Sequence, residues 1–274
     1  TLLARRTTVP LLLVPTGVAL WSVFAYDRRV GATLARVANG QLFSADAGSG
    51  FVASAHALQA AVPVLAACAV FLASQSIAAD FAGATLRNTL LRSVRRGDVV
   101  FGKFGALLAS IGAALVVLVT TTVAAAAATR GFGDLEEVSK HGDRQVLAAA
   151  GDVAPVFVRS LLHCMLPLGA VTAIGLAVSA LTKRPARALA FALFAVLGPE
   201  VARDALRTNA GWLLTSHLPT GLRDDSVLGW FAALARGAAD ALWPWQASAF
   251  LAPLAWLVAG LGLAAWRLHR VRVA

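Results

Sequence analysis

Residues 80–103 read DFAGATLRNTLLRSVRRGDVVFGK, a basic stretch between two long apolar ones. The stretch holds Arg87, Arg92, Arg95, Arg96 and Lys103. The apolar run before it ends near residue 79, and the run after it covers residues 104–129. Because moving Lys and Arg across a bilayer is costly, membrane proteins keep such clusters on the cytoplasmic side. This connector therefore predicts the orientation of the whole chain.

The composition is that of a membrane protein. Of 274 residues, 58% are hydrophobic and only 14% are charged, whereas soluble domains carry roughly 25% charged residues. The net charge of +10 first suggests a nucleic-acid partner. The basic residues, however, stand at the ends of apolar runs, as membrane topology requires, so we expect no nucleic-acid binding.

Six apolar runs are long enough to be considered as membrane spans, which need about 20 residues to cross ~30 Å of hydrocarbon. Spanning segments must satisfy their backbone internally, so all six are expected to be helices and the fold class is an all-α polytopic membrane protein. The chain is expected to form a single transmembrane domain over residues 1–274. The predicted spans are residues 8–26, 51–79, 104–129, 156–181, 186–202 and 246–266.

The distribution of charge supports this topology. With the N-terminus inside, the expected cytoplasmic pieces are residues 1–7, 80–103, 182–187 and 267–274. They hold 13 of the 24 Lys and Arg residues and only two of the 14 acidic ones. This asymmetry is what the positive-inside rule predicts, and it places both termini in the cytoplasm.

Three segments are expected outside. Residues 27–50 predict a loop with a short helix, and residues 130–154 predict a small acidic cap. Residues 203–243 are too polar to span and too apolar for a plain loop, which favours a re-entrant or interfacial helix pair before the last span. Within it, residues 226–243 predict an amphipathic helix with its apolar side chains toward lipid: Val227, Trp230, Phe231, Leu234 and Leu242.

The connector itself predicts an amphipathic helix over residues 81–97. Leu86, Leu90 and Val94 recur at helical spacing, with the arginines on the other side. Such a helix is either an anchor in the lipid headgroups or a coupling helix that docks on a soluble subunit. Residues 97–103 match the first seven positions of a P-loop, but Phe104 replaces the Ser or Thr that holds magnesium. Any ATP and Mg²⁺ are therefore expected on a partner subunit, with no cofactor on this chain.

The connector also resembles the signature of ABC transporter type-2 permeases. The family pattern has an acidic residue closing the second span, a G-T-L-like element, paired leucines, an arginine turn with proline, and G-K opening the third span. This chain has Asp80 in place of Glu and Ala84 in place of Gly, and it lacks the proline. The matching positions are Asp80, Ala84-Thr85-Leu86, Leu90-Leu91, Arg95-Arg96 and Gly102-Lys103.

The resemblance implies a dimer, formed with a second copy or a related permease, that rests on cytoplasmic ABC ATPase subunits. Coupling would involve Asp80, Arg87, Arg92, Arg95, Arg96 and Lys103. The expected function is ATP-driven export of an apolar or amphipathic cargo across the bacterial inner membrane, in contact with its lipid. The alternatives are an ion-coupled secondary transporter or channel, and a structural anchor of a membrane complex.

Few charged residues lie inside the predicted spans, where such residues normally indicate function. Arg159 and His163 are one helical turn apart and are candidates for a transport pathway, although a snorkelling Arg159 is the favoured interpretation. Glu200 is a further pathway candidate. With Arg203, Asp204 and Arg207 it has spacings that allow local ion pairs. The residues show no spacing typical of an enzyme site or a metal site.

Overall fold

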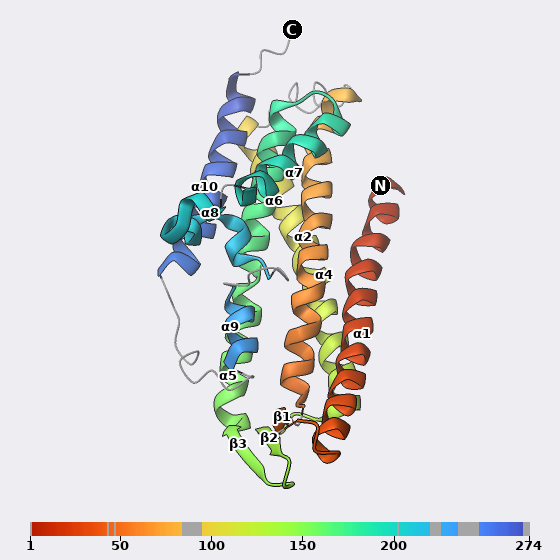
Figure 1. The fold of residues 1–274 in the computed structure, drawn as a ribbon. Coiled ribbons are helices and arrows are strands. Elements are labelled where there is room, and N and C mark those ends of the chain that lie inside the picture. The colour runs from red at the N-terminus through yellow and green to blue at the C-terminus, as the bar shows by residue number, and fades with distance from the viewer. Residues whose placement is uncertain are drawn as a thin grey trace.

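The structure is a computed structural model that describes residues 2–42, 44–46, 48–83, 95–201, 203–219, 226–234 and 247–270. Its elements form an elongated helical bundle with a small sheet at one end (Figure 1). The elements in chain order are α1 (Leu2–Ala38), β1 (Ser44–Asp46), α2 (Gly50–Ala82), α4 (Arg96–Arg130), β2 (Leu135–Ser139), β3 (Arg144–Ala148), α5 (Ala150–His163), α6 (Met165–Leu181), α7 (Pro185–Val201), α8 (Arg203–Leu206), the 3₁₀ turns η1 (Arg207–Trp212) and η2 (Leu214–His217), α9 (Val227–Leu234) and α10 (Ala247–Arg270).

Five helical segments of the described chain are long and apolar enough to cross a membrane: α1, α2, α4, α5 with α6, and α10. This confirms a helical, polytopic membrane protein. The predicted fifth span corresponds to α7, which has 17 residues. At 1.5 Å per residue α7 is about 25 Å long, somewhat short of the ~30 Å hydrocarbon core.

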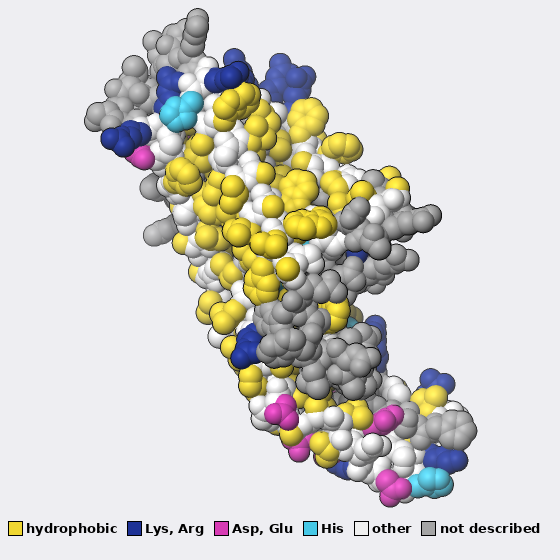
Figure 2. Space-filling view, turned by 90° about the vertical axis from the view of Figure 1, so that its left-hand side faces the viewer, with side chains coloured by type: hydrophobic (Ala, Val, Ile, Leu, Met, Phe, Trp, Pro, Cys, Tyr) yellow, Lys and Arg dark blue, Asp and Glu magenta, His cyan; other side chains and the backbone are white. Residues whose placement is uncertain are grey.

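The charges divide the bundle into two ends and a band between them. We call the end that carries Arg95, Arg96, Lys103, Lys183, Arg184, Arg187, Arg267 and Arg270 the basic end, and the opposite one the sheet end. Residues 7–26, 50–79, 104–129, 160–182 and 247–266 contain no Asp, Glu, Lys or Arg. In Figure 2 the visible apolar side chains cover the region between a basic upper end and a lower end that holds most of the visible acidic groups.

Helix α6 lies between α2 and α10, and small residues allow the close approach. A Cβ atom on Gly260 of α10 would lie 2.8 Å from the carbonyl carbon of Ala173, and one on Gly175 would lie 2.8 Å from the Cβ of Ala73. Within a membrane, where no hydrophobic effect drives helices together, such close packing is a main source of association.

The helices continue beyond the thickness of a bilayer at the sheet end. With 33 residues, α2 is about 50 Å long, so about ten residues at its start extend past a ~30 Å core. Together with the ends of α1 and α4, they pack against α5, α9 and the sheet, a unit that we call the outer module after the side of the membrane that the sequence predicts for it. Phe51 lies at its centre, with ring centroids 4.8 Å from Phe132 and 5.8 Å from Phe157, and Phe157 is 5.1 Å from Phe231.

The sheet of the outer module is antiparallel, in the order β1-β2-β3. Ser44 pairs with Ser139 and Glu137 pairs with Gln145. The Asp134 carboxylate accepts a hydrogen bond from the Ala150 amide at the start of α5, with a distance of 2.7 Å. The expected acidic cap is therefore a hairpin that also caps a helix, and this small sheet was not predicted.

Two expectations about the sheet end are wrong. Residues 27–38 continue α1 as a helix rather than forming a loop, because Val30 and Val37 extend its buried face and Asp27 pairs with Arg130 at 2.6 Å. Phe231 does not face lipid: it is buried against Phe157 in the outer module. Of the predicted amphipathic helix 226–243, the structure describes α9, and residues 235–243 lie outside the described residues.

The ends of the connector also differ from the prediction of a helix over residues 81–97. Residues 80–82 form the last turn of α2, and Gly83 caps it by donating to Ala79 O. Helix α4 begins at Arg96, so the P-loop-like residues 97–103 are helical. The rest of the predicted coupling helix, residues 84–94, lies outside the described residues.

Candidate functional site

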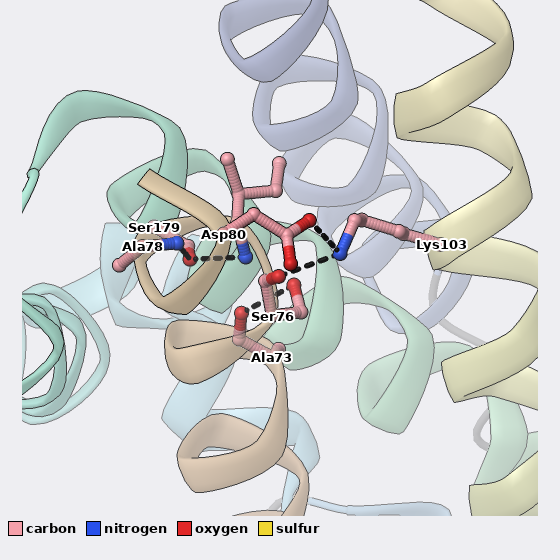
Figure 3. A network of polar contacts seen from close by, with 7 residues as sticks. Ala73, Ser76, Ala78, Asp80, Lys103 and Ser179 are labelled. Atoms are coloured by element: carbon pink, nitrogen blue, oxygen red, sulfur yellow. Dashed lines mark hydrogen bonds and ion pairs between the residues drawn. The ribbon is translucent and has the colours of Figure 1, made fainter. Parts of the chain in front are cut away.

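The two ends of the connector are joined by an ion pair. Lys103, in the second turn of α4, places Nζ 2.7 Å from Asp80 Oδ2 in the last turn of α2. The same ammonium group donates to the Ser76 carbonyl at 2.6 Å (Figure 3). Each side chain of the pair is about 70% buried. The ion pair thus holds together the two helix ends from which the basic connector extends.

Ser179 of α6 binds the same part of α2. Its Oγ accepts hydrogen bonds from the amides of Ile77 and Ala78, at 3.0 and 2.9 Å (Figure 3). In a regular helix the Ile77 amide would donate to the Ala73 carbonyl, which here accepts from Ser76 Oγ at 2.9 Å. This turn of α2 is therefore bound to α6 through a serine hydroxyl that accepts from two of its amides.

A compact hydrophobic cluster lies beneath these polar contacts, and we call it the inner cluster. It is separate from the main core and is built from α2, α4, α6 and α10. In the described chain its buried members are Ile77, Val99, Val100, Leu176, Ala177, Ala180, Ala264 and Leu268. Displacing the ends of the connector would therefore act on four packed helices at once.

Arg96 ties α4 to the end of α10. Its Nη1 donates to the carbonyls of Leu268 and His269, at 3.2 and 2.9 Å. The last carbonyls of a helix have no donor within the helix and carry a partial negative charge, so a guanidinium group is a suitable cap. Arg95, one residue earlier, is exposed.

The structure thus brings together some of the predicted coupling residues. Asp80 and Lys103 contact each other, Arg95 is exposed just before α4, and Arg96 is engaged within the chain. Arg87 and Arg92 lie outside the described residues. Ser179 was missed, because a single serine in an apolar span gives no sequence signal for the helix it binds.

A second polar region lies where α7 ends. Glu200 accepts a hydrogen bond from Arg203 Nη1 at 2.8 Å through one carboxylate oxygen, and from Thr215 Oγ1 of η2 through the other. Helix α7 starts at the basic end, and Glu200 lies 13 residues after Arg187, which corresponds to about 20 Å along the helix. Trp256, near the middle of α10, donates to the carbonyl of Trp212 in η1 at 2.9 Å. These contacts place the region at the depth of the apolar band.

His163 stands at the break between α5 and α6. Its Nε2 is 2.8 Å from the carbonyl of Ala249 in the first turn of α10. That carbonyl would normally accept from the amide of residue 253, which is Pro253 and has no N–H. Because a carbonyl only accepts, this contact requires the proton on Nε2. His163 thus supplies the hydrogen bond that the proline removes.

The predicted pathway residues are therefore only partly brought together. Glu200 binds Thr215 of η2, and His217, two residues later, has its Nε2 2.8 Å from the Gly211 carbonyl rather than bonded to His163. Arg159 is on an exposed face of α5, away from the buried His163. No group of three or more His, Cys, Asp or Glu suited to a metal ion occurs in the described part of the chain.

Residues 2–202 match the model of the ABC-2 family transporter proteins, which covers well over half of the chain. No curated protein matches at a significant level. The match confirms the resemblance drawn from the connector, and the chain belongs to the ABC-2 family of transporter proteins.

Proposed function

We propose that this chain is the membrane subunit of an ATP-driven ABC exporter whose ATPase is a separate cytoplasmic protein. In this proposal the protein crosses the bacterial inner membrane six times, with α7 beginning the fifth crossing and both termini in the cytoplasm. The family match supports a permease. A coupling role for the connector is supported by the junction at the basic end, where the connector ends are joined to each other and to α6 and α10.

The mechanism follows from these contacts. ATP-driven closure of two ATPase subunits displaces the connectors of a permease dimer. Because Asp80–Lys103 and Arg96 bind the connector ends to neighbouring helices, the displacement moves α2, α4, α6 and α10 together. A ligand shifts such an equilibrium only by its differential affinity for the two states. The connector is the element that transmits this difference from ATP to the membrane helices.

The test is capture of the ATPase by a permease with reversed charges in the connector. Arg87, Arg92 and Arg95 are changed together to Glu, and Arg96 is kept because it caps α10. We expect the triple variant to insert normally and to lose ATPase capture and transport. Binding and transport at the level of the unchanged protein would refute the coupling role.

A matched control is available at the other end of the molecule. Arg28, Arg29 and Arg36 are exposed residues of α1 toward the sheet end, and reversing them makes the same change in net charge. This control is expected to keep ATPase capture. Loss of capture in both variants would indicate a general effect of net charge and would count against a specific contact.

One observation favours a second candidate, an ion-coupled carrier. Such carriers place ionisable groups within the membrane, and Glu200 and Arg203 lie at the depth of the apolar band. Transport into ATP-free vesicles, driven only by an ion gradient, would favour this alternative. A purely structural anchor would assemble with its partners and show no flux under either condition.

A further inference from the structure

We propose that Glu200 and Arg203 form a head-group site, entered from the lipid side of α7, for an amphiphile that carries a protonated amine. The inference rests on the proposed function, because it assigns a class of cargo to the permease. It extends that function by naming the residues that first contact the cargo and the charge that they recognise.

The first step concerns the free-energy cost of placing the Glu200–Arg203 ion pair at membrane depth. Charged side chains at membrane depth are expensive, and they are retained where they serve a function or pair with one another. The Arg203 side chain is only 7% exposed, and its carboxylate partner is 2.8 Å away. The pair is thus stable where it lies, and its cost at membrane depth is consistent with a functional role.

The second step is the asymmetry of the pair. The Glu200 side chain is 36% exposed, about five times the exposed fraction of the Arg203 side chain. A molecule approaching from outside the bundle therefore meets the carboxylate before it meets the guanidinium group. In a low-dielectric environment this arrangement attracts a cation and repels an anion.

The third step is the surface around the carboxylate. Phe194, Leu197 and Val201 form an apolar stripe on the same side of α7, and they are 74%, 57% and 92% exposed. Leu197 precedes Glu200 by three residues, so the two side chains are neighbours on the helix. A hydrocarbon tail can lie along this stripe while its head group binds Glu200, which selects an amphiphile over a small hydrophilic cation.

The fourth step is the polar path beyond the pair. Thr215 binds Glu200 and is followed by Ser216 and His217, and all three of these side chains are buried. Irregular backbone such as η1 and η2 occurs at membrane depth only where protein or a water-filled cavity surrounds it. These polar groups extend the site from Glu200 into the interior of the bundle, away from the lipid.

The test is direct binding to the purified permease in phosphatidylcholine nanodiscs without any ATPase. Radiolabelled dodecylamine is the probe, dodecanol is the uncharged match, and empty nanodiscs give the background. We expect specific retention of the amine and little of the alcohol. Glu200→Gln keeps the shape and the hydrogen-bond acceptor and removes the charge, and it should weaken amine binding by about ten-fold or more, the value of a charge-assisted hydrogen bond.

Two further variants separate binding from structure. Glu136→Gln makes the same chemical change in the outer sheet, where Glu136 pairs with Arg144 at 3.1 Å, and it should bind the amine normally. Glu200→Asp keeps the negative charge at the same position, so it should retain amine binding that Glu200→Gln loses, and equal loss of amine binding in both variants would count against a role for the charge. Equal retention of amine and alcohol, or undiminished amine binding by Glu200→Gln, would overturn the site.

This result is independent of the coupling test. Loss of the amine site with intact ATPase capture would leave the permease assignment standing and remove only this class of cargo. Specific amine binding without ATPase capture would keep the site and favour the ion-coupled carrier.

Discussion

The hydrogen bond between His163 and the Ala249 carbonyl allows a quantitative test of how α10 is held. Replacing His163 with Phe keeps an aromatic ring that can still contact Phe250, now 4.9 Å away edge to face, and removes the N–H donor. The Ala249 carbonyl then has no donor, because residue 253 is a proline. Leaving a buried carbonyl unsatisfied costs about 1–3 kcal/mol, so His163→Phe should reduce the free energy of unfolding by that amount.

The substitution Pro253→Ala provides the second half of the test. The new alanine carries the N–H that a helix directs at the carbonyl four residues earlier, so the Ala249 carbonyl gains a donor within α10. In that background His163→Phe should cost about 1 kcal/mol or less. The double-mutant cycle therefore predicts a coupling of about 1–2 kcal/mol between two residues on different helices.

The assay is thermal unfolding of the two single variants and the double variant in the same detergent. For a chain of this size, 1 kcal/mol corresponds to about 2–4 °C in apparent Tm. Pro15→Ala is the control, because Pro15 lies inside α1, and combining it with His163→Phe should be additive. An equal cost of His163→Phe in the unchanged protein and in the Pro253→Ala background would refute the reasoning.

Three further outcomes are expected. Asp80→Asn or Lys103→Met should lower the unfolding free energy by only about 1 kcal/mol, since the pair is partly exposed. Each variant should nevertheless lose most of its transport activity in proteoliposomes. Exchanging the two charges should restore part of that transport. Ser179→Ala removes a hydroxyl that accepts from two α2 amides and should cost about 1 kcal/mol, with faster hydrogen exchange in that turn; unchanged exchange there would count against the contact. Gly260→Val places side-chain carbons against Ala173, within 2.8 Å at Cβ, and should cost about 1–3 kcal/mol or more; an unchanged apparent Tm would show that α6 and α10 can separate without loss.

The helices of the apolar band were predictable because the hydrocarbon core of a membrane disfavours charge at each position, whatever the neighbouring helices are. A charge-free run of about 20 residues identifies a span without knowledge of its neighbours. The predicted span at 104–129 accordingly lies within α4, and the one at 246–266 matches α10 to within a few residues. Asp80 and Lys103 were predictable for a related reason, since each is the first charge beyond an apolar run.

The outer module was not predictable in this way, because no bilayer constrains it. Its core joins Phe51, Phe132, Phe157 and Phe231, which come from four separate segments of the chain. In a single sequence, an apolar residue beyond a span is equally consistent with contact to lipid and with packing in a protein core. The placement of Phe231 toward lipid failed for this reason.

For the polar side chains, the sequence indicates one partner of a contact but does not identify the other. Pro253 already implies that the carbonyl four residues earlier needs another donor, but only the fold identifies His163 as that donor. The same holds for Ser179, which is one of several serines in apolar runs. A sequence can thus indicate where a hydrogen bond is missing, whereas the residue that supplies it depends on helix packing.

Arg96 shows why this distinction matters for coupling. From its position in the connector it was expected to contact the ATPase, yet its guanidinium group caps the last turn of α10. An arginine that contacted only a moving partner subunit would transmit force to the helices only through the backbone of the connector. An arginine that also binds α10 transmits it directly to a helix that packs against α6 through Gly260 and Ala173. In the proposed mechanism, the efficiency of coupling would then depend on the rigidity of the inner cluster as well as on the ATPase contact, because force is lost wherever packed helices can slide.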